Sequence, residues 1–104
     1  MKKYESLLIF KPSISKENLT SVISELISKI EKNKGSIIKE ESLGVKELAT
    51  EIKHKKEGHY YLIQFESDTQ TLSDLESVFK VTEDLMRHII VDFYSVYSKE
   101  TING

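Results

Sequence analysis

Three histidines and one pair of adjacent glutamates are the side chains in this 104-residue sequence whose types suit chemistry. His54 and His59 flank a lysine-rich stretch, and they could ligate a metal only with carboxylates brought from elsewhere in the chain. Glu40 and Glu41 are neighbours, so on an extended strand they point to opposite faces and make a poor acid–base pair. Together with His88, we interpret these residues as solvated or packed side chains, none of them catalytic.

The common catalytic and cofactor motifs are missing from the sequence. With no cysteine, it cannot form a disulfide framework, a thiolate zinc site or a cysteine nucleophile. It has no glycine-rich dinucleotide motif, no Walker loop, no metalloprotease His-Glu-x-x-His motif and no nucleophile elbow. We therefore predict that the protein is not an enzyme and that it holds no metal and no cofactor.

Positive charge is distributed unevenly along the chain, whose formal net charge is -2. Residues 1–56 hold twelve lysines against eight acidic residues, whereas residues 57–104 hold three basic residues against nine acidic ones. A locally basic face on an acidic molecule can contact a phosphate backbone. An ordinary solvated surface has the same composition, and on composition alone we favour that interpretation. The lysines that suit contact with folded RNA are Lys2, Lys3, Lys39, Lys46, Lys53, Lys55 and Lys56.

Hydrophobic periodicity predicts a strand and then a helix in the first third of the chain. Residues 3–10 are rich in aliphatic and aromatic residues and stop before Pro12, which cannot donate to a strand ladder. Apolar residues then recur at steps of three and four between Leu19 and Ile30, which is typical of an amphipathic helix. We expect Ser15 to cap this helix and Gly35 to end it in the left-handed conformation.

A central hairpin is predicted next. Residues 36–53 form one long strand with a bulge or close approach at Gly44, residues 54–58 form a polar turn, and residues 60–67 form the second strand. The end of the chain repeats the earlier pattern, with a helix at 69–80 and a strand at 85–96.

The predicted order β-α-β-β-α-β defines an α+β, ferredoxin-like sandwich, with a four-stranded antiparallel sheet and two helices on one face. We expect one domain at residues 1–97, followed by a loosely ordered tail at residues 98–104. The opposite sheet face carries no helix, so its apolar residues should be exposed and should mark a partner surface. These predicted partner residues are Leu7, Ile9, Tyr60, Leu62, Ile89 and Val91.

An RNA-recognition motif has the same order of elements. Its third strand carries a basic residue, a glycine, an aromatic, a small residue and a second aromatic. Here Glu57 stands at the basic position and Tyr60 at the small one. We therefore disfavour base stacking and expect contact with the RNA backbone instead.

Short motifs along the chain resemble a known family. The sequence starts Met1-Lys2-Lys3-Tyr4-Glu5, and it later reads Leu43-Gly44-Val45-Lys46-Glu47-Leu48-Ala49 and Gly58-His59-Tyr60, with Asp84-Leu85-Met86-Arg87 before the last strand. In order and spacing these motifs are similar to the bacterial small-subunit ribosomal protein S6 family. The resemblance covers residues 1 to about 97.

The resemblance implies the fold derived above and a structural role in the cytoplasmic ribosome. Members of the family bind the central domain of small-subunit ribosomal RNA together with ribosomal protein S18. The sequence departs from the family pattern at Thr50-Glu51, Glu47 and Asp92, each of which removes a plausible RNA contact. The RNA-binding residues that we predict are Lys2, Lys3, Lys46, Lys53 and Arg87.

Two other classes of protein share this fold. A regulatory or oligomerisation module would use the helix-free face to pair with a second copy, and a size measurement with and without S18 distinguishes this alternative. An acylphosphatase would need an arginine and a phosphate loop after the first strand, which residues 11–14 do not supply. The apolar run at residues 7–10 is too short for a signal peptide or a membrane span, so we expect a cytoplasmic protein.

Overall fold

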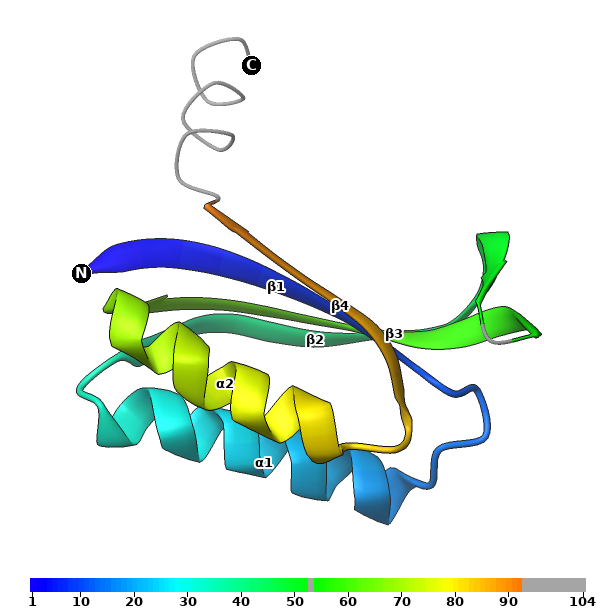
Figure 1. Cartoon of the computed structure of the whole chain (residues 1–104), viewed down its shortest axis with the longest axis horizontal. Helices are drawn as coiled ribbons and strands as arrows, with labels where there is room; N and C mark the ends of the chain where they lie inside the picture. Colours follow the sequence, from blue (N-terminus) through cyan, green and yellow to red (C-terminus); the bar gives the residue numbers. More distant parts are fainter. Residues whose placement is uncertain (53, 93–104) are drawn as a thin grey trace, which may run out of the picture.

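The chain folds in the predicted β-α-β-β-α-β order (Figure 1). This computed structural model describes residues 1–52 and 54–92. Lys53, residues 93–96 of the expected last strand and the tail at 98–104 lie outside the described residues. The elements are β1 Lys2–Phe10, α1 Lys16–Lys32, β2 Ser36–Ile52, β3 Lys55–Ser67, α2 Thr69–Val81 and β4 Leu85–Asp92.

All four strands belong to one antiparallel sheet in the order β2-β3-β1-β4. Both helices pack side by side on the same face of this sheet, and the described residues place no helix on the other face (Figure 1). The predicted ferredoxin-like α+β class is therefore confirmed.

The core lies between the sheet and the helices. Tyr4, Leu8 and Phe10 of β1 are buried on the helix-covered face, as the two-residue period of the strand predicts. Ile63 and Phe65 of β3 are buried on the same face. The helices contribute Ile23, Leu26, Ile30, Leu75, Val78 and Phe79 to this cluster.

The start of α1 agrees with the sequence, but its end differs from the prediction. The Oγ atom of Ser15 accepts a hydrogen bond from the backbone N–H of Asn18 at 3.1 Å, which confirms the predicted cap. The left-handed residue after the helix is Lys34, with φ of 68°, and not Gly35. Glycine is needed at position 35 for space, because a Cβ there would lie 2.5 Å from the carbonyl oxygen of Glu66.

The β2–β3 hairpin is longer than predicted. Its bulge is confirmed at Gly44, where the register shifts and φ is 79°. The expected turn at residues 54–58 was wrong, since β3 begins at Lys55, which pairs with Ile52. The ends of β2 and β3 that meet in the hairpin extend beyond the body of the domain (Figure 1). Side chains there have no core to pack against, so this part of the two strands is polar. Its polar sequence is therefore easily mistaken for that of a turn.

The second helix begins at a charged cap. Oδ1 of Asp68 accepts hydrogen bonds from the backbone N–H of Thr71 at 3.0 Å and from its hydroxyl at 2.9 Å. The backbone bond is the main reason that the pKa of the Asp68 carboxyl is lowered, because it stabilises the ionised form. Among the described residues, no helix has the length and apolar character to cross a membrane.

Candidate partner and RNA interface

Three aliphatic side chains form a row across the helix-free face of the sheet. In the strand register, Leu7 of β1 lies opposite Leu62 of β3 on one side and opposite Ile89 of β4 on the other. Directly opposed residues in an antiparallel sheet project to the same face, so their side chains are neighbours. Ile89 is 44% exposed, while Leu7 and Leu62 are half-buried. A contiguous apolar row of this kind offers a partner surface.

The next row contains one correction to the predicted partner residues. Tyr60, Ile9 and Arg87 lie opposite one another across β3, β1 and β4. Ile9 was expected to be exposed, but it is only 6% exposed. The reason is Gly58: a Cβ there would lie 2.5 Å from Cγ2 of Ile9 and 3.2 Å from Cε of Met86, so these two side chains pack over the bare glycine backbone.

The row on the other side of the apolar row is mixed: Val91 is apolar and exposed, Glu5 is charged, and the polar Gln64 is buried. Val91, which is 47% exposed, lies opposite Glu5, and Glu5 lies opposite Gln64. Oε1 of Glu5 accepts a hydrogen bond from Nε2 of Gln64 at 2.9 Å. These two residues form a polar boundary at the edge of an apolar patch. We call this patch the open face, defined by Leu7, Tyr60, Leu62, Ile89 and Val91.

One group of predicted RNA-binding residues lies at the start of β1. Lys3 lies opposite Glu66 on the helix-free side, and Lys2 lies opposite Ser67 on the helix side. Both lysines line a hollow of about 340 Å³ together with Glu66 and Asp92. The two carboxylates reduce the positive field at this end of the sheet.

The other two predicted RNA-binding residues that the structure describes lie at the far end of the sheet. Arg87 on β4 lies opposite Ile9, and Lys46 on β2 lies opposite Gly58. At about 3.3 Å per strand residue, the six residues from position 3 to position 9 separate this end from the amino-terminal lysines by about 20 Å. The four predicted RNA-binding residues that the structure describes therefore form two groups at opposite ends of the sheet, and not one cluster.

A set of polar contacts on the helix side of β2 was not predicted. The hydroxyl of Tyr61 donates to Oε1 of Glu40 at 3.3 Å, and Oγ of Ser42 lies 2.9 Å from Nε2 of His59. Burial, followed by the neighbouring Glu40 carboxylate, raises the pKa of the Tyr61 hydroxyl. Glu41 points to the opposite face, as the adjacent-glutamate argument predicts, because its register partner is Leu62. Only the strand register could have revealed these pairs.

The described histidines do not gather into a metal site. His54 lies 4.0 Å from Glu51, and His88 lies 3.1 Å from Glu76, so each has one carboxylate neighbour. Within residues 1–52 and 54–92, no group of three or more histidines and carboxylates is placed to hold a metal ion.

A ferredoxin-like domain with an apolar patch on its helix-free face and cations at both ends of that patch is a small α+β binding protein. Residues 3–92, which make up most of the domain, match the family model of ribosomal protein S6. The chain belongs to the ribosomal protein S6 family. This is a family of ribosomal proteins, whose role is structural rather than catalytic.

Individual relatives agree with the family match. Small ribosomal subunit protein bS6 of Nitratiruptor sp. is 33% identical over 93 residues, which cover 89% of this chain and 73% of the relative. The protein of the same name from Desulforamulus reducens is 33% identical over 91 residues, which cover 88% and 96% of the two chains.

Solved structures give the same result. The crystal structure of 30S ribosomal protein S6 from Thermotoga maritima matches with a TM-score of 0.83 at 32% identity and covers 98% of this chain and 96% of that one. The C-terminal domain of the MgtC protein from Mycobacterium tuberculosis, at a TM-score of 0.59 and 8% identity, shares the fold alone.

Proposed function

We propose that the protein is a structural component of the bacterial small ribosomal subunit in the cytoplasm. In this role it binds the central domain of small-subunit ribosomal RNA together with ribosomal protein S18. The match of residues 3–92 to the ribosomal protein S6 family carries the proposal. Relatives that share about a third of its aligned residues are named small ribosomal subunit proteins, which supports the same assignment.

The open face is the surface that we assign to S18. Leu7, Leu62 and Ile89 form an apolar row that is partly exposed to water in the isolated chain. Covering such a row removes apolar area from water, which contributes about 25 cal/mol per Å². Tyr60 and Arg87 border the row and belong to residue types that often dominate binding at interfaces.

The predicted cations at the two ends of the sheet are the residues that we assign to the RNA. Lys2 and Lys3 lie at one end and Lys46 and Arg87 at the other, so a partner seated between them leaves both groups at its edges. Lys53 completes the set assigned from the sequence. We expect the two proteins to engage the RNA as a pair, so S18 should add contacts and strengthen RNA binding through joint binding.

A second function is favoured by the same apolar row. The open face is suited to pairing with a second copy of this chain, as in a regulatory or oligomerisation module. A homodimer that forms through this face and ignores S18 would support that alternative.

The experiment that tests the proposal is the substitution Leu62→Asp. Docking of S18 would trap the new carboxylate in an apolar interface without a partner, so S18 binding should be lost. Binding of a central-domain RNA fragment should then fall in titrations with S18 present, while RNA binding by the protein alone should change little. Circular dichroism establishes that the variant is folded.

The matched control is Val81→Asp. Val81 is 77% exposed at the end of α2, away from the open face, so this variant should keep its affinity for S18 and for RNA. Unchanged S18 binding by folded Leu62→Asp would exclude the open face as the docking surface. Failure of the wild-type protein to bind the RNA with S18 would overturn the proposed function itself.

A further inference from the structure

A groove of about 480 Å³ lies between α1 and β2, on the side of the sheet opposite to the open face. Leu19, Ile23 and Ile27 of α1 form its apolar wall, and Tyr61 of β3 contributes an aromatic ring. The tyrosine and the isoleucine at position 27 are only partly buried. This volume is in the range of grooves that enclose a ligand or several side chains of a peptide.

The shape of the groove favours an elongated occupant. A second hollow of about 550 Å³ shares Ser24 and Ile27 with the first and continues along α1 to Glu31 and Lys32. Together the two hollows follow much of the length of the helix. A compact small molecule would fill only part of this space, whereas an extended polypeptide could follow it.

The strand beside the groove is the outer strand of the sheet. β2 pairs with β3 on one side and forms the sheet edge on the other. Its register is regular from Lys39 to Ser42, between the shifts at positions 37–39 and 42–44. A regular edge segment offers backbone N–H and C=O groups to an added strand, whose alternate side chains would project toward α1.

The charge of the groove indicates which segment fits it. Oε1 of Glu40 accepts a hydrogen bond from Tyr61, yet no lysine or arginine within residues 1–52 and 54–92 forms an ion pair with Glu40. A short turn joins the end of α1 to the start of β2, so the two elements run in opposite directions. Counted back from this turn, Glu40 on β2 and Ser24 on α1 lie at about the same distance along their elements. Lys16, eight residues away along the helix, therefore lies at the far end of the groove, about 12 Å from that level. A basic side chain from a partner would compensate the carboxylate.

We propose that this groove binds an extended segment of a partner protein that carries a lysine or arginine with aliphatic residues two positions before and after it, so that all three side chains share one face. The backbone of the segment pairs with the edge of β2 between Lys39 and Ser42. Its basic side chain contacts Glu40, and its aliphatic side chains contact Ile27 and Leu19. RNA is a poorer occupant, because Glu40 would repel its phosphates. The inference is independent of the S18 proposal, since the groove and the open face lie on opposite sides of the sheet.

The test uses the ¹⁵N-labelled protein and a capped heptapeptide, Thr-Val-Thr-Lys-Thr-Val-Thr, whose lysine and two valines share one face of an extended strand. The control peptide has glutamate in place of the lysine. Amide resonances of β2 around Glu40 and of α1 around Ser24 should shift and saturate at millimolar lysine peptide, and the glutamate peptide should bind at least about tenfold more weakly. Glu40→Gln should reduce affinity for the lysine peptide about fivefold to tenfold, and Ser24→Trp, which fills the groove, should abolish binding.

Two variants serve as controls. Glu25→Gln removes a charge from an exposed position of α1 that does not line the groove, and it should leave binding unchanged. Leu62→Asp should also bind the peptide normally, because it alters only the open face. The proposal is overturned if neither peptide binds, if both bind equally, if the shifts fall on the open face, or if Glu40→Gln has no effect. Concentration-dependent shifts of β2 without peptide would identify a second copy of the chain as the occupant instead.

Discussion

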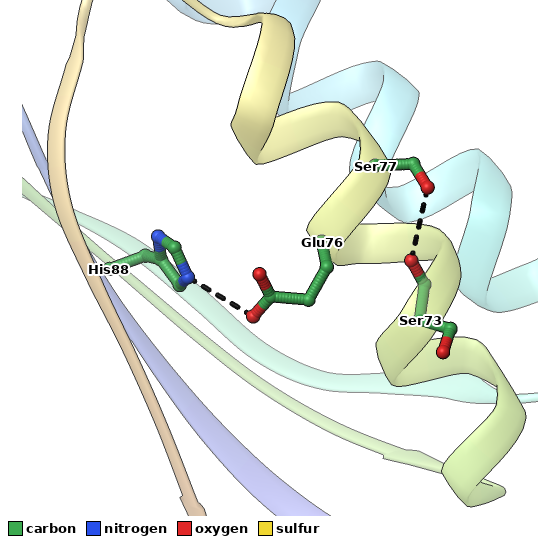
Figure 2. A network of polar contacts seen from close by, with 4 residues as sticks. All are labelled: Ser73, Glu76, Ser77 and His88. Carbon is green, nitrogen blue, oxygen red and sulfur yellow. Dashed lines mark hydrogen bonds and ion pairs between the residues drawn. The ribbon is translucent and has the colours of Figure 1, made fainter.

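Nε2 of His88 on β4 lies 3.1 Å from Oε1 of Glu76 on α2, so a polar contact joins the edge strand to the helix that covers it (Figure 2). The imidazole also packs on Phe79, with ring centroids 4.3 Å apart. Within α2, the hydroxyl of Ser77 donates a hydrogen bond to the carbonyl oxygen of Ser73, one turn earlier, at 3.2 Å. His88 therefore contributes one polar and one aromatic contact to the packing of β4 against α2.

A double-mutant cycle of His88→Ala and Glu76→Ala should give a coupling free energy of about 0.2 to 1 kcal/mol, because both side chains are partly exposed to water. The cycle cancels the separate loss of packing between His88 and Phe79. The measurement is urea denaturation of the four proteins at low and at high salt. Coupling that falls with salt identifies an ion pair, and zero coupling at low salt would contradict the contact.

Asp68→Asn should separate the charge of the α2 cap from its hydrogen bonding. The lowered pKa of Asp68 means that its ionised form stabilises the fold above the ordinary carboxyl pKa of 3.8, and that this stabilisation is lost as pH falls through the lower folded-state pKa. The asparagine variant keeps an acceptor for Thr71 but cannot titrate. Thermal melts from pH 7 to pH 2 should therefore show a smaller acid-induced loss of stability in Asp68→Asn, whereas parallel curves would contradict the role of the charge.

Ile63→Ala and Leu62→Ala form a matched pair on adjacent positions of β3. Ile63 is 2% exposed in the core, so its truncation should cost about 2 to 5 kcal/mol of unfolding free energy. Leu62 is half-buried on the open face, and its truncation should cost clearly less. Chemical denaturation measures both values, and a larger cost for Leu62 would mean that the face assignment is reversed.

Ser6→Ala should be neutral or stabilise the protein by up to about 1 kcal/mol. The Oγ atom of Ser6 is buried on the helix side of β1, and the described residues give it no hydrogen-bond partner, so its removal relieves a desolvated polar group. Ser67→Ala is the matched control, since the buried Ser67 hydroxyl donates to the carbonyl oxygen of Asp68 at 3.0 Å. Calorimetry should find a loss of about 1 kcal/mol for this control.

Lys46→Glu and Arg87→Glu should weaken binding of the central-domain RNA in the presence of S18. Each removes a cation from one end of the open face, so the slope of log affinity against log salt should decrease by about 1 per lost phosphate contact. Lys29→Glu and Lys80→Glu, near the ends of the helices, make the same change of charge elsewhere. Equal losses in all four variants would indicate net charge and not a defined RNA-binding surface.

Local features of the chain could be predicted because their causes lie within a few residues. The apolar stripe from Leu19 to Ile30, the cap at Ser15 and the bulge at Gly44 each follow from side-chain spacing or from one backbone preference. The alternation along β1 and β3 predicted which residues enter the core, since successive strand residues face opposite sides.

The predicted site could not be completed from the sequence, because exposure depends on neighbours that are distant along the chain. Ile9 alternates with core residues as Leu7 does. It is nevertheless buried, because the bare backbone of Gly58 on the next strand leaves room for it to pack beside Met86. The same holds for Gly35, whose role is the close approach to Glu66, thirty-one residues away.

The sequence by itself determined the order of the elements, the face of each strand that enters the core, and the resemblance that the family match confirms. Only the tertiary structure decided that the four described RNA-binding candidates form two groups about 20 Å apart, and that Glu40 lies beside a groove under α1. Periodicity reports which side of its own element a residue occupies. Register and packing, which depend on contacts between residues far apart in the chain, determine what that residue meets there.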